Sequence, residues 1–178
     1  MFIPGIAISI ITFPGVIVHE AAHMLFCKLR KVAVFDVKFF QFDANVAGYV
    51  FHEEPADFAS SFLISMGPFL VNSLLCIVIC FPASISIYVF EDMNFVSAFL
   101  LWLGVSIGMH AFPSNQDAKI IWEKAKGETR KKNLFAILSF PLVILVYLAN
   151  ILRFVWFDTI YGVFIGIVLP GMLFQKIL

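Results

Sequence analysis

Charged residues are scarce in this sequence. Asp, Glu, Lys and Arg together make up 13% of its 178 residues, whereas 61% are hydrophobic and 22 are phenylalanine. Soluble domains contain about 25% charged and about 45–50% apolar residues, so a soluble fold of this length could not bury so much apolar surface. With a mean hydropathy of +0.96, the composition excludes an ordinary soluble domain and predicts an integral membrane protein in contact with the lipid bilayer.

An excess of charge, a cysteine framework and a basic N-terminal region are also missing. The net charge is zero, so nothing indicates a nucleic-acid partner. Cys27, Cys76 and Cys80 form no CxxC pair and lie in or beside apolar runs, which is typical of packing residues and not of disulfides or metal ligands. The first apolar run has no basic flank and no small-residue cleavage site, so we expect a retained span and not a removed signal peptide.

Five apolar stretches approach the roughly 20 residues that a spanning helix needs. They are Phe2–Leu29, Phe58–Phe81, Phe95–Phe112, Leu134–Leu152 and Thr159–Phe174. No linker, repeat or low-complexity tract divides the chain, so we expect one all-α polytopic membrane domain over residues 1–178, with about five transmembrane helices. Only RFVWFD separates the last two stretches, which predicts a C-terminal helical hairpin over residues 134–176.

The basic residues predict the orientation of these spans. They cluster in CKLRK after the first stretch and in KIIWEKAKGETRKK after the third, whereas the opposite loops hold EDMN and a lone Arg153. The positive-inside rule then places the N-terminus outside and the C-terminus in the cytoplasm. The ends of the first and third spans emerge together on the cytoplasmic side.

One segment between the first two spans does not resemble a helix. Residues Val32–Phe51 are rich in β-branched and aromatic side chains that partly alternate, and Asp43-Ala44-Asn45 and Gly48 favour turns. This pattern predicts a short β-hairpin. Because the segment is too apolar for a solvated loop, we expect it to be associated with the membrane and paired or buried in protein.

The pattern HEAAH interrupts the first apolar stretch with three polar side chains, His19, Glu20 and His23. Residues four apart lie on the same face of a helix, so both imidazoles can point at one ion. Glu20 is rotated aside, where it can reach a metal-bound water. HExxH is the motif of zinc metalloproteases, with two histidine ligands and a carboxylate base. Because ionisable groups are costly inside a span, a functional site is favoured over chance packing.

A catalytic zinc needs a third protein ligand and an open position. Phe26 and Leu29 stand where an extended HExxHxxGxxH motif requires Gly and His, so that class is excluded. Asp43 lies at a suitable distance along the chain but in the predicted hairpin, and His52 follows the hairpin beside two glutamates. Asp117 lies just beyond the cytoplasmic end of the third span, and HExxH lies near the cytoplasmic end of the first, so topology favours Asp117.

Charge also favours one carboxylate ligand. Zn²⁺ with neutral His19 and His23 and with ionised Asp117 and Glu20 sums to zero, which limits the solvation penalty of a site below the membrane surface. The alternative role of Asp117 is to cap the amphipathic helix that begins near it.

Three motifs together resemble the site-2 protease family of intramembrane zinc metalloproteases. They are HEAAH in the first core helix, GPFLVNS in the next span, and SNQDA, which is similar to the Asn-Pro-Asp-Gly motif whose Asp completes the zinc site in that family. The resemblance covers residues 10–125, the catalytic core. Gln116 and Ala118 replace the Pro and Gly of the family motif, and the spacing from Gly67 to Asn72 is one residue longer. A small or divergent member is therefore expected.

The resemblance implies zinc-dependent hydrolysis of peptide bonds in transmembrane or membrane-associated protein substrates. Glu20 would take a proton from the attacking water and deliver it to the leaving amine. Asn72 and Asn115 resemble asparagines of the family that could stabilise the oxyanion, and His110 lies about two turns before Asp117. These side chains could equally make interhelical hydrogen bonds.

A substrate helix must unwind before its peptide bonds can react. The hairpin over Val32–Phe51 could hold the unwound segment by β-addition. Two other functions stay open. One is a non-catalytic membrane protein that binds metal through HExxH with four protein ligands, including His110 or His52. The other is a degenerate member that binds transmembrane partners without cutting them, for which the general base Glu20 would have no use.

Overall fold

The computed structural model describes residues 5–43 and 46–177 and is mostly helical, with one two-stranded antiparallel sheet. This confirms the helical class that the sequence predicts. The elements are α1 (Gly5–Ile11), α2 (Phe13–Leu29), β1 (Val34–Lys38), β2 (Tyr49–His52), α3 (Phe58–Tyr88), α4 (Phe95–Met109), α5 (Asn115–Thr129), α6 (Leu134–Leu152), the 3₁₀ turn η1 (Arg153–Val155), α7 (Phe157–Val163), the π-helical turn η2 (Phe164–Val168) and α8 (Leu169–Ile177).

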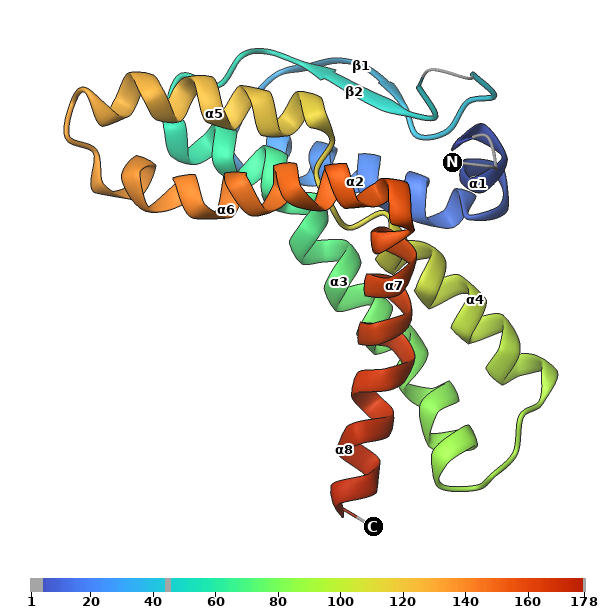
Figure 1. Cartoon of the computed structure of the whole chain (residues 1–178). Coiled ribbons are helices and arrows are strands. Elements are labelled where there is room, and N and C mark those ends of the chain that lie inside the picture. Colours follow the sequence, from blue (N-terminus) through green and yellow to red (C-terminus); the bar gives the residue numbers. More distant parts are fainter. Residues whose placement is uncertain (1–4, 44–45, 178) are drawn as a thin grey trace.

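The molecule is L-shaped, with α2, α5, α6 and the sheet in one arm and α4, α7 and α8 in the other (Figure 1). The long helix α3 contributes to the core of both arms. One core cluster joins α3 to α5 and α6 through Phe58, Met66, Ala118, Ile121, Ala125, Ala136, Val143 and Val146. A second joins α3 to α4 and η2 through Cys76, Cys80, Ala83, Leu101 and Ile165. The three cysteines are buried and free, as expected for packing residues.

Three helical segments are long and apolar enough to cross a membrane, namely Phe58–Tyr88, Leu134–Val155 and Phe157–Phe174. Large apolar side chains are exposed along them, for example Leu74 at 61% and Leu138 at 63%. Contiguous apolar surface of this kind is unfavourable in water. The chain is therefore a membrane protein, but the structure does not confirm five spans.

The first predicted span is divided in two at Thr12. Pro14 lies at the start of α2, and a proline has no N–H to donate to the preceding turn, while its ring clashes with the carbonyl four residues earlier. The remaining helix α2 has 17 residues. The third predicted span is also short, because α4 has 15 residues and ends before His110.

The residues predicted to form a C-terminal helical hairpin form a corner between α6 and α7 instead. Helix α6 and the α7–α8 segment leave their junction in different directions (Figure 1). At the junction Trp156 adopts a left-handed conformation with φ 64°, which interrupts the helix and changes its direction. The two segments therefore do not lie side by side.

The predicted β-hairpin is present. Strands β1 and β2 pair antiparallel, with Val37 opposite Val50 and Lys38 opposite Tyr49. The hydroxyl of Tyr49 donates a hydrogen bond to Asp36, which raises the pKa of Tyr49. Of the predicted turn residues, Ala44 and Asn45 lie outside the described residues. The strands lie over α2 in Figure 1.

The start of α3 is capped by the side chain of Asp57. Asp57 accepts hydrogen bonds from the backbone N–H and hydroxyl of Ser60, which lower its pKa. A group with a lowered folded pKa stabilises the fold above its unfolded pKa and loses that contribution as the pH falls through its folded pKa. We expect Asp57→Ala to lower the free energy of unfolding by about 1 kcal/mol at pH 7. In detergent melts, the difference from the parent should shrink below about pH 4, and an undiminished difference at pH 2.5 would contradict this account.

Candidate metal centre

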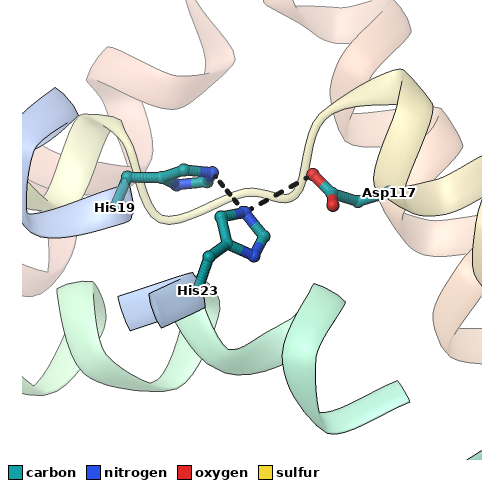
Figure 2. Close-up of side chains that lie close together, drawn as sticks. All are labelled: His19, His23 and Asp117. Atoms are coloured by element: carbon teal, nitrogen blue, oxygen red, sulfur yellow. Dashed lines mark hydrogen bonds and ion pairs between the residues drawn. The ribbon is translucent and has the colours of Figure 1, made fainter. Parts of the chain in front are cut away.

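Three side chains with metal-ligating atoms come together where α2 meets the start of α5. His19 and His23 project from α2, and Asp117 projects from the first turn of α5 (Figure 2). The Nε2 atoms of the two histidines lie 3.2 Å apart, and Nε2 of His23 lies 3.7 Å from Oδ2 of Asp117. The fold thus brings together the three residues that the sequence predicts as metal ligands.

Backbone carbonyls hold both imidazole rings. Nδ1 of His19 lies 2.6 Å from the carbonyl oxygen of His110, and Nδ1 of His23 lies 2.9 Å from that of Ile64. Because a carbonyl oxygen only accepts, each Nδ1 must donate, and each Nε2 of a neutral ring then carries a lone pair. Two lone pairs that face each other across 3.2 Å repel unless a proton or a metal ion lies between them. Metal-binding histidines are oriented by the same kind of bond from their other ring nitrogen.

The spacing of the ligand atoms suits one ion. The three atoms lie within 4.8 Å of one another. In a tetrahedral zinc site with zinc–ligand distances of about 2.0–2.2 Å, two ligand atoms lie about 3.3–3.6 Å apart. The pairs at 3.2 and 3.7 Å already have this spacing, and the third pair would have to close by up to about 1.2 Å for all three atoms to contact one zinc ion.

Asp117 is also part of a capping box at the start of α5. Its Oδ2 accepts hydrogen bonds from the backbone N–H and the hydroxyl of Ser114 at 3.0 and 2.6 Å, and its own N–H donates to the Ser114 oxygen at 3.1 Å. The cap holds the carboxylate on the side of His23, so capping and proximity to the histidines coexist. Sequence reasoning missed Ser114, although the spacing Ser-x-x-Asp is the pattern of such a cap.

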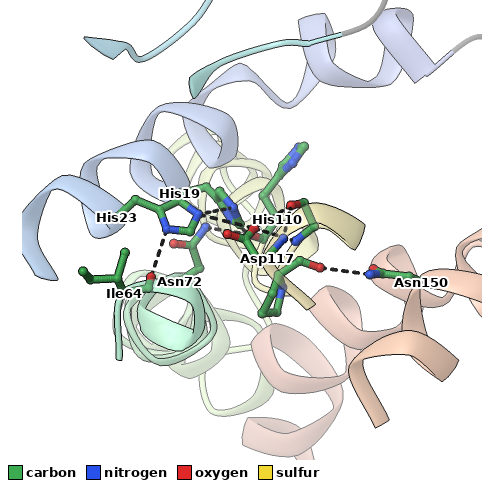
Figure 3. A network of polar contacts seen from close by, with 9 residues as sticks. His19, His23, Ile64, Asn72, His110, Asp117 and Asn150 are labelled. Carbon is green, nitrogen blue, oxygen red and sulfur yellow. Dashed lines mark hydrogen bonds and ion pairs between the residues drawn. The ribbon is translucent and has the colours of Figure 1, made fainter. Parts of the chain in front are cut away.

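Asn72 ties three helices together beneath the histidines. It is fully buried on α3, and its Nδ2 lies 3.1, 3.2 and 3.3 Å from the carbonyl oxygens of Ile107, His110 and Gly15. Figure 3 shows Asn72 in the network with His19 and His110. The His110 carbonyl therefore accepts from both Asn72 and His19. Asn72 thus makes interhelical hydrogen bonds, the second of its two predicted roles, and it helps to orient the candidate ligand His19 through the carbonyl that they share.

The side chain of His110 also makes a hydrogen bond, separate from those of its backbone carbonyl. Its Nε2 lies 2.8 Å from the hydroxyl oxygen of Thr12, and this hydroxyl donates to the carbonyl of Ile8 at 2.7 Å. Because the Thr12 hydrogen is used, Nε2 of His110 must be the donor in their bond. Thr12, at the break between α1 and α2, was not identified from the sequence.

Two glycines allow the close approach of helices on which these bonds depend. A β-carbon on Gly15 would lie 2.0 Å from the carbonyl oxygen of Ser106, and one on Gly67 would lie 2.2 Å from Cδ2 of Phe26. Real β-carbons do not come so close to other atoms. Gly15 thus permits α2 to cross α4, and Gly67 permits it to contact α3, which places both histidines against their carbonyl partners.

A cavity of about 370 Å³ opens beside the histidines. Its titratable lining residues are His19, Glu20, Asp43, His110, Arg153 and Asp158. Glu20 is 9% exposed, and it lies close enough to Asp117 for the two charges to interact. A β-carbon on Gly48 would lie 2.8 Å from Cγ of Glu20, so the segment that leads into β2 packs directly against the predicted base.

The other predicted site residues take different positions. Asn115 is exposed on the first turn of α5 and does not line the cavity, so it is not placed to meet a reacting group. Asp43 lines the cavity but is not a member of the His19–His23–Asp117 cluster. His52 lies at the end of β2, with Nδ1 2.7 Å from the carbonyl oxygen of Glu53.

Three residues near the candidate metal centre come from the C-terminal part of the chain, which contains none of the sequence motifs. Nδ2 of Asn150 donates to the carbonyl of Pro113 at 3.1 Å, and Figure 3 shows it reaching from α6 to the network around Asp117. Arg153 and Asp158 line the cavity, with 2.7 Å between Nε and Oδ2. These contacts depend on the corner between α6 and α7.

Comparison of the chain with protein-family models, with curated proteins and with solved structures finds no match.

Proposed function

We propose that this protein is an intramembrane zinc metalloprotease that hydrolyses peptide bonds of transmembrane or membrane-associated proteins. The observation that carries the proposal is the pair of Nε2 atoms 3.2 Å apart, each on a ring whose Nδ1 donates to a backbone carbonyl. With Asp117 beside them, these atoms form a donor set of two imidazoles and one carboxylate, which suits zinc. Buried Glu20, which lies close enough to Asp117 for the two charges to interact, would then serve as the base.

The chain's own residues account for the proton transfers of hydrolysis. When bound, zinc would polarise the scissile carbonyl and lower the pKa of the attacking water to about 7. Glu20 accepts a proton from that water as the oxygen bonds to the carbonyl carbon. It then gives the proton to the amide nitrogen as the C–N bond breaks. His19, His23 and Asp117 would hold the ion, and the carbonyls of His110 and Ile64 keep the imidazoles in the tautomer that could bind it.

A catalytic site is favoured over a closed structural metal site. A structural zinc has four protein ligands, whereas within residues 5–43 and 46–177 the cluster holds three. The sequence offered His110 or His52 as a fourth ligand, but neither belongs to the cluster, and the ring of His110 is bonded to Thr12. A three-ligand cluster beside a cavity leaves a position for water and substrate.

The β-hairpin is proposed to hold the unwound substrate. An isolated two-stranded sheet has free edges that can pair with an extended peptide, and β2 begins at Tyr49, next to the glycine that packs against Glu20. A strand added at this edge would reach the base. We further propose that the site faces the cytoplasm, because basic residues cluster after α2 and along α5, the two helices that carry the candidate ligands. Arg153, which the sequence assigns to a loop on the opposite side, instead lines the cavity of this site.

Zinc content and peptide cleavage test this function together. We expect the purified protein in detergent to bind one zinc and to cut apolar peptides from a synthetic library, with product masses read by mass spectrometry. Asp117→Asn weakens one of three ligands, so zinc affinity should fall at least about 10-fold and cleavage should be lost. The matched control is Asp92→Asn, which changes an exposed loop carboxylate.

Two results would contradict the proposal. If Asp117→Asn keeps stoichiometric zinc and full cleavage, Asp117 is not a ligand. If the zinc-loaded parent cuts none of the peptides while binding zinc tightly, the non-catalytic metal-binding function is favoured instead.

A further inference from the structure

The oxyanion donors expected from the sequence are engaged or misplaced in the fold. Nδ2 of Asn72 faces three carbonyl oxygens, and Nε2 of His110 is bonded to Thr12. Asn115 is exposed and away from the cavity. A peptidase site still needs a group that stabilises negative charge where it develops on the carbonyl oxygen, because this is a large part of catalysis.

Arg153 is a cation that lines the same cavity as His19 and Glu20. It lies within Leu134–Val155, a segment apolar enough to span a membrane. Charged side chains in such segments are costly and generally serve a function. His19, a candidate metal ligand, and His110 line the same cavity as Arg153, so the guanidinium shares the wall that carries the site.

The guanidinium is oriented and still has donors to spare. Its Nε lies 2.7 Å from Oδ2 of Asp158, across the corner that Trp156 forms between α6 and α7. The terminal nitrogens make no hydrogen bond with residues in the described part of the chain. A planar guanidinium carries five N–H donors in a fixed fork. The ion pair with Asp158 can therefore orient the guanidinium while its terminal N–H groups are left for a ligand in the cavity.

We propose that Arg153 is a further catalytic residue of this site and donates hydrogen bonds to the oxyanion of the tetrahedral intermediate. The inference rests on the proposed peptidase function. As the water oxygen bonds to the carbonyl carbon, the π electrons of the C=O bond move onto the carbonyl oxygen. The guanidinium donates hydrogen bonds to the negative charge that develops there. When the C–N bond breaks, the electrons return and the hydrogen bonds weaken. Asp158 positions the guanidinium.

Kinetics on the zinc-loaded protein test this role. We expect Arg153→Gln to lower kcat about 10²–10³-fold, the usual effect of removing one oxyanion donor, with little change in KM or zinc content. Adding guanidinium ion should partly restore turnover to Arg153→Ala, which a purely structural role does not predict. Arg130→Gln, at an exposed arginine after α5, should behave as the parent.

Binding of a tetrahedral mimic provides a readout that is independent of turnover. An amidated phosphinic tripeptide with apolar side chains should bind the zinc-loaded parent at least about 10-fold more tightly than it binds Arg153→Gln. The matching unmodified peptide is tested on Glu20→Gln, which should cleave it slowly. It should bind this variant and the double variant Glu20→Gln, Arg153→Gln with equal affinity. Equal phosphinate affinity for parent and Arg153→Gln would overturn the inference, even if no peptide is cleaved. Cleavage by Arg153→Gln at the parental rate would overturn it while leaving the peptidase function standing.

Discussion

Replacing Glu20 by Gln is expected to slow peptide cleavage by about 10²–10⁴-fold while leaving zinc in place. The amide has the size of the carboxylate but cannot accept a proton from water. General acid–base groups contribute about 10²–10⁴ to turnover, so we expect a loss within that range. Zinc should stay bound because Glu20 is not one of the three clustered ligands. Metal analysis and product masses from the same preparation measure both effects.

A matched glutamate separates this effect from a general change in charge. Glu123, exposed on α5, does not line the cavity, so Glu123→Gln should cleave as the parent does. Parental turnover in zinc-loaded Glu20→Gln would remove the general base from the mechanism. Loss of zinc from that variant would show instead that Glu20 is needed to bind the metal.

A single methyl group at Gly15 is expected to disrupt the metal centre. The β-carbon of Gly15→Ala would lie 2.0 Å from the carbonyl oxygen of Ser106 and 2.5 Å from Cδ2 of His110. A backbone oxygen cannot rotate away as a side chain can, so α2 must move from α4. That movement pulls His19 from the His110 carbonyl. We expect a loss of about 1–3 kcal/mol in stability and a 10–100-fold loss in zinc affinity.

Gly127→Ala is the control for this substitution. Gly127 lies in α5, and a β-carbon there would meet no atom within 4 Å. Alanine favours helix over glycine by about 1 kcal/mol, so this variant should be as stable as the parent or slightly more stable, with unchanged zinc affinity. Calorimetric zinc titrations and thermal midpoints in detergent compare the two. If Gly15→Ala matches Gly127→Ala in both measurements, the close crossing does not support the site.

The membrane class, the pairing of the two histidines and the β-hairpin could be predicted from composition and from the periodicity of the sequence. Apolar residues in long runs indicate a membrane protein, and the structure contains three segments suited to span. The spacing of His19 and His23 fixes them on one helical face, and their Nε2 atoms are neighbours. The alternating segment before α3 does form a hairpin. Each of these properties depends on residues that are close in the sequence.

Helix ends and helix directions were harder to predict. Hydropathy averages over a window, so it did not separate α1 from α2 at Thr12 or register that α4 ends before His110. It also carries no information on direction. The left-handed conformation of Trp156 turns the expected hairpin of residues 134–176 into a corner, and no turn residue in RFVWFD signalled it.

By itself the sequence determined the class of the protein, the HExxH face of α2 and the choice of Asp117 over Asp43 and His52 as the third candidate ligand. Only the tertiary structure decided which groups surround them. Every residue has a backbone carbonyl, so the sequence does not show which carbonyls will accept from the histidines. Those of His110 and Ile64 do so only because Gly15 and Gly67 let the helices approach closely. Arg153 reaches the cavity for a similar reason, since a turn of the backbone far along the chain brings it to the wall beside His19.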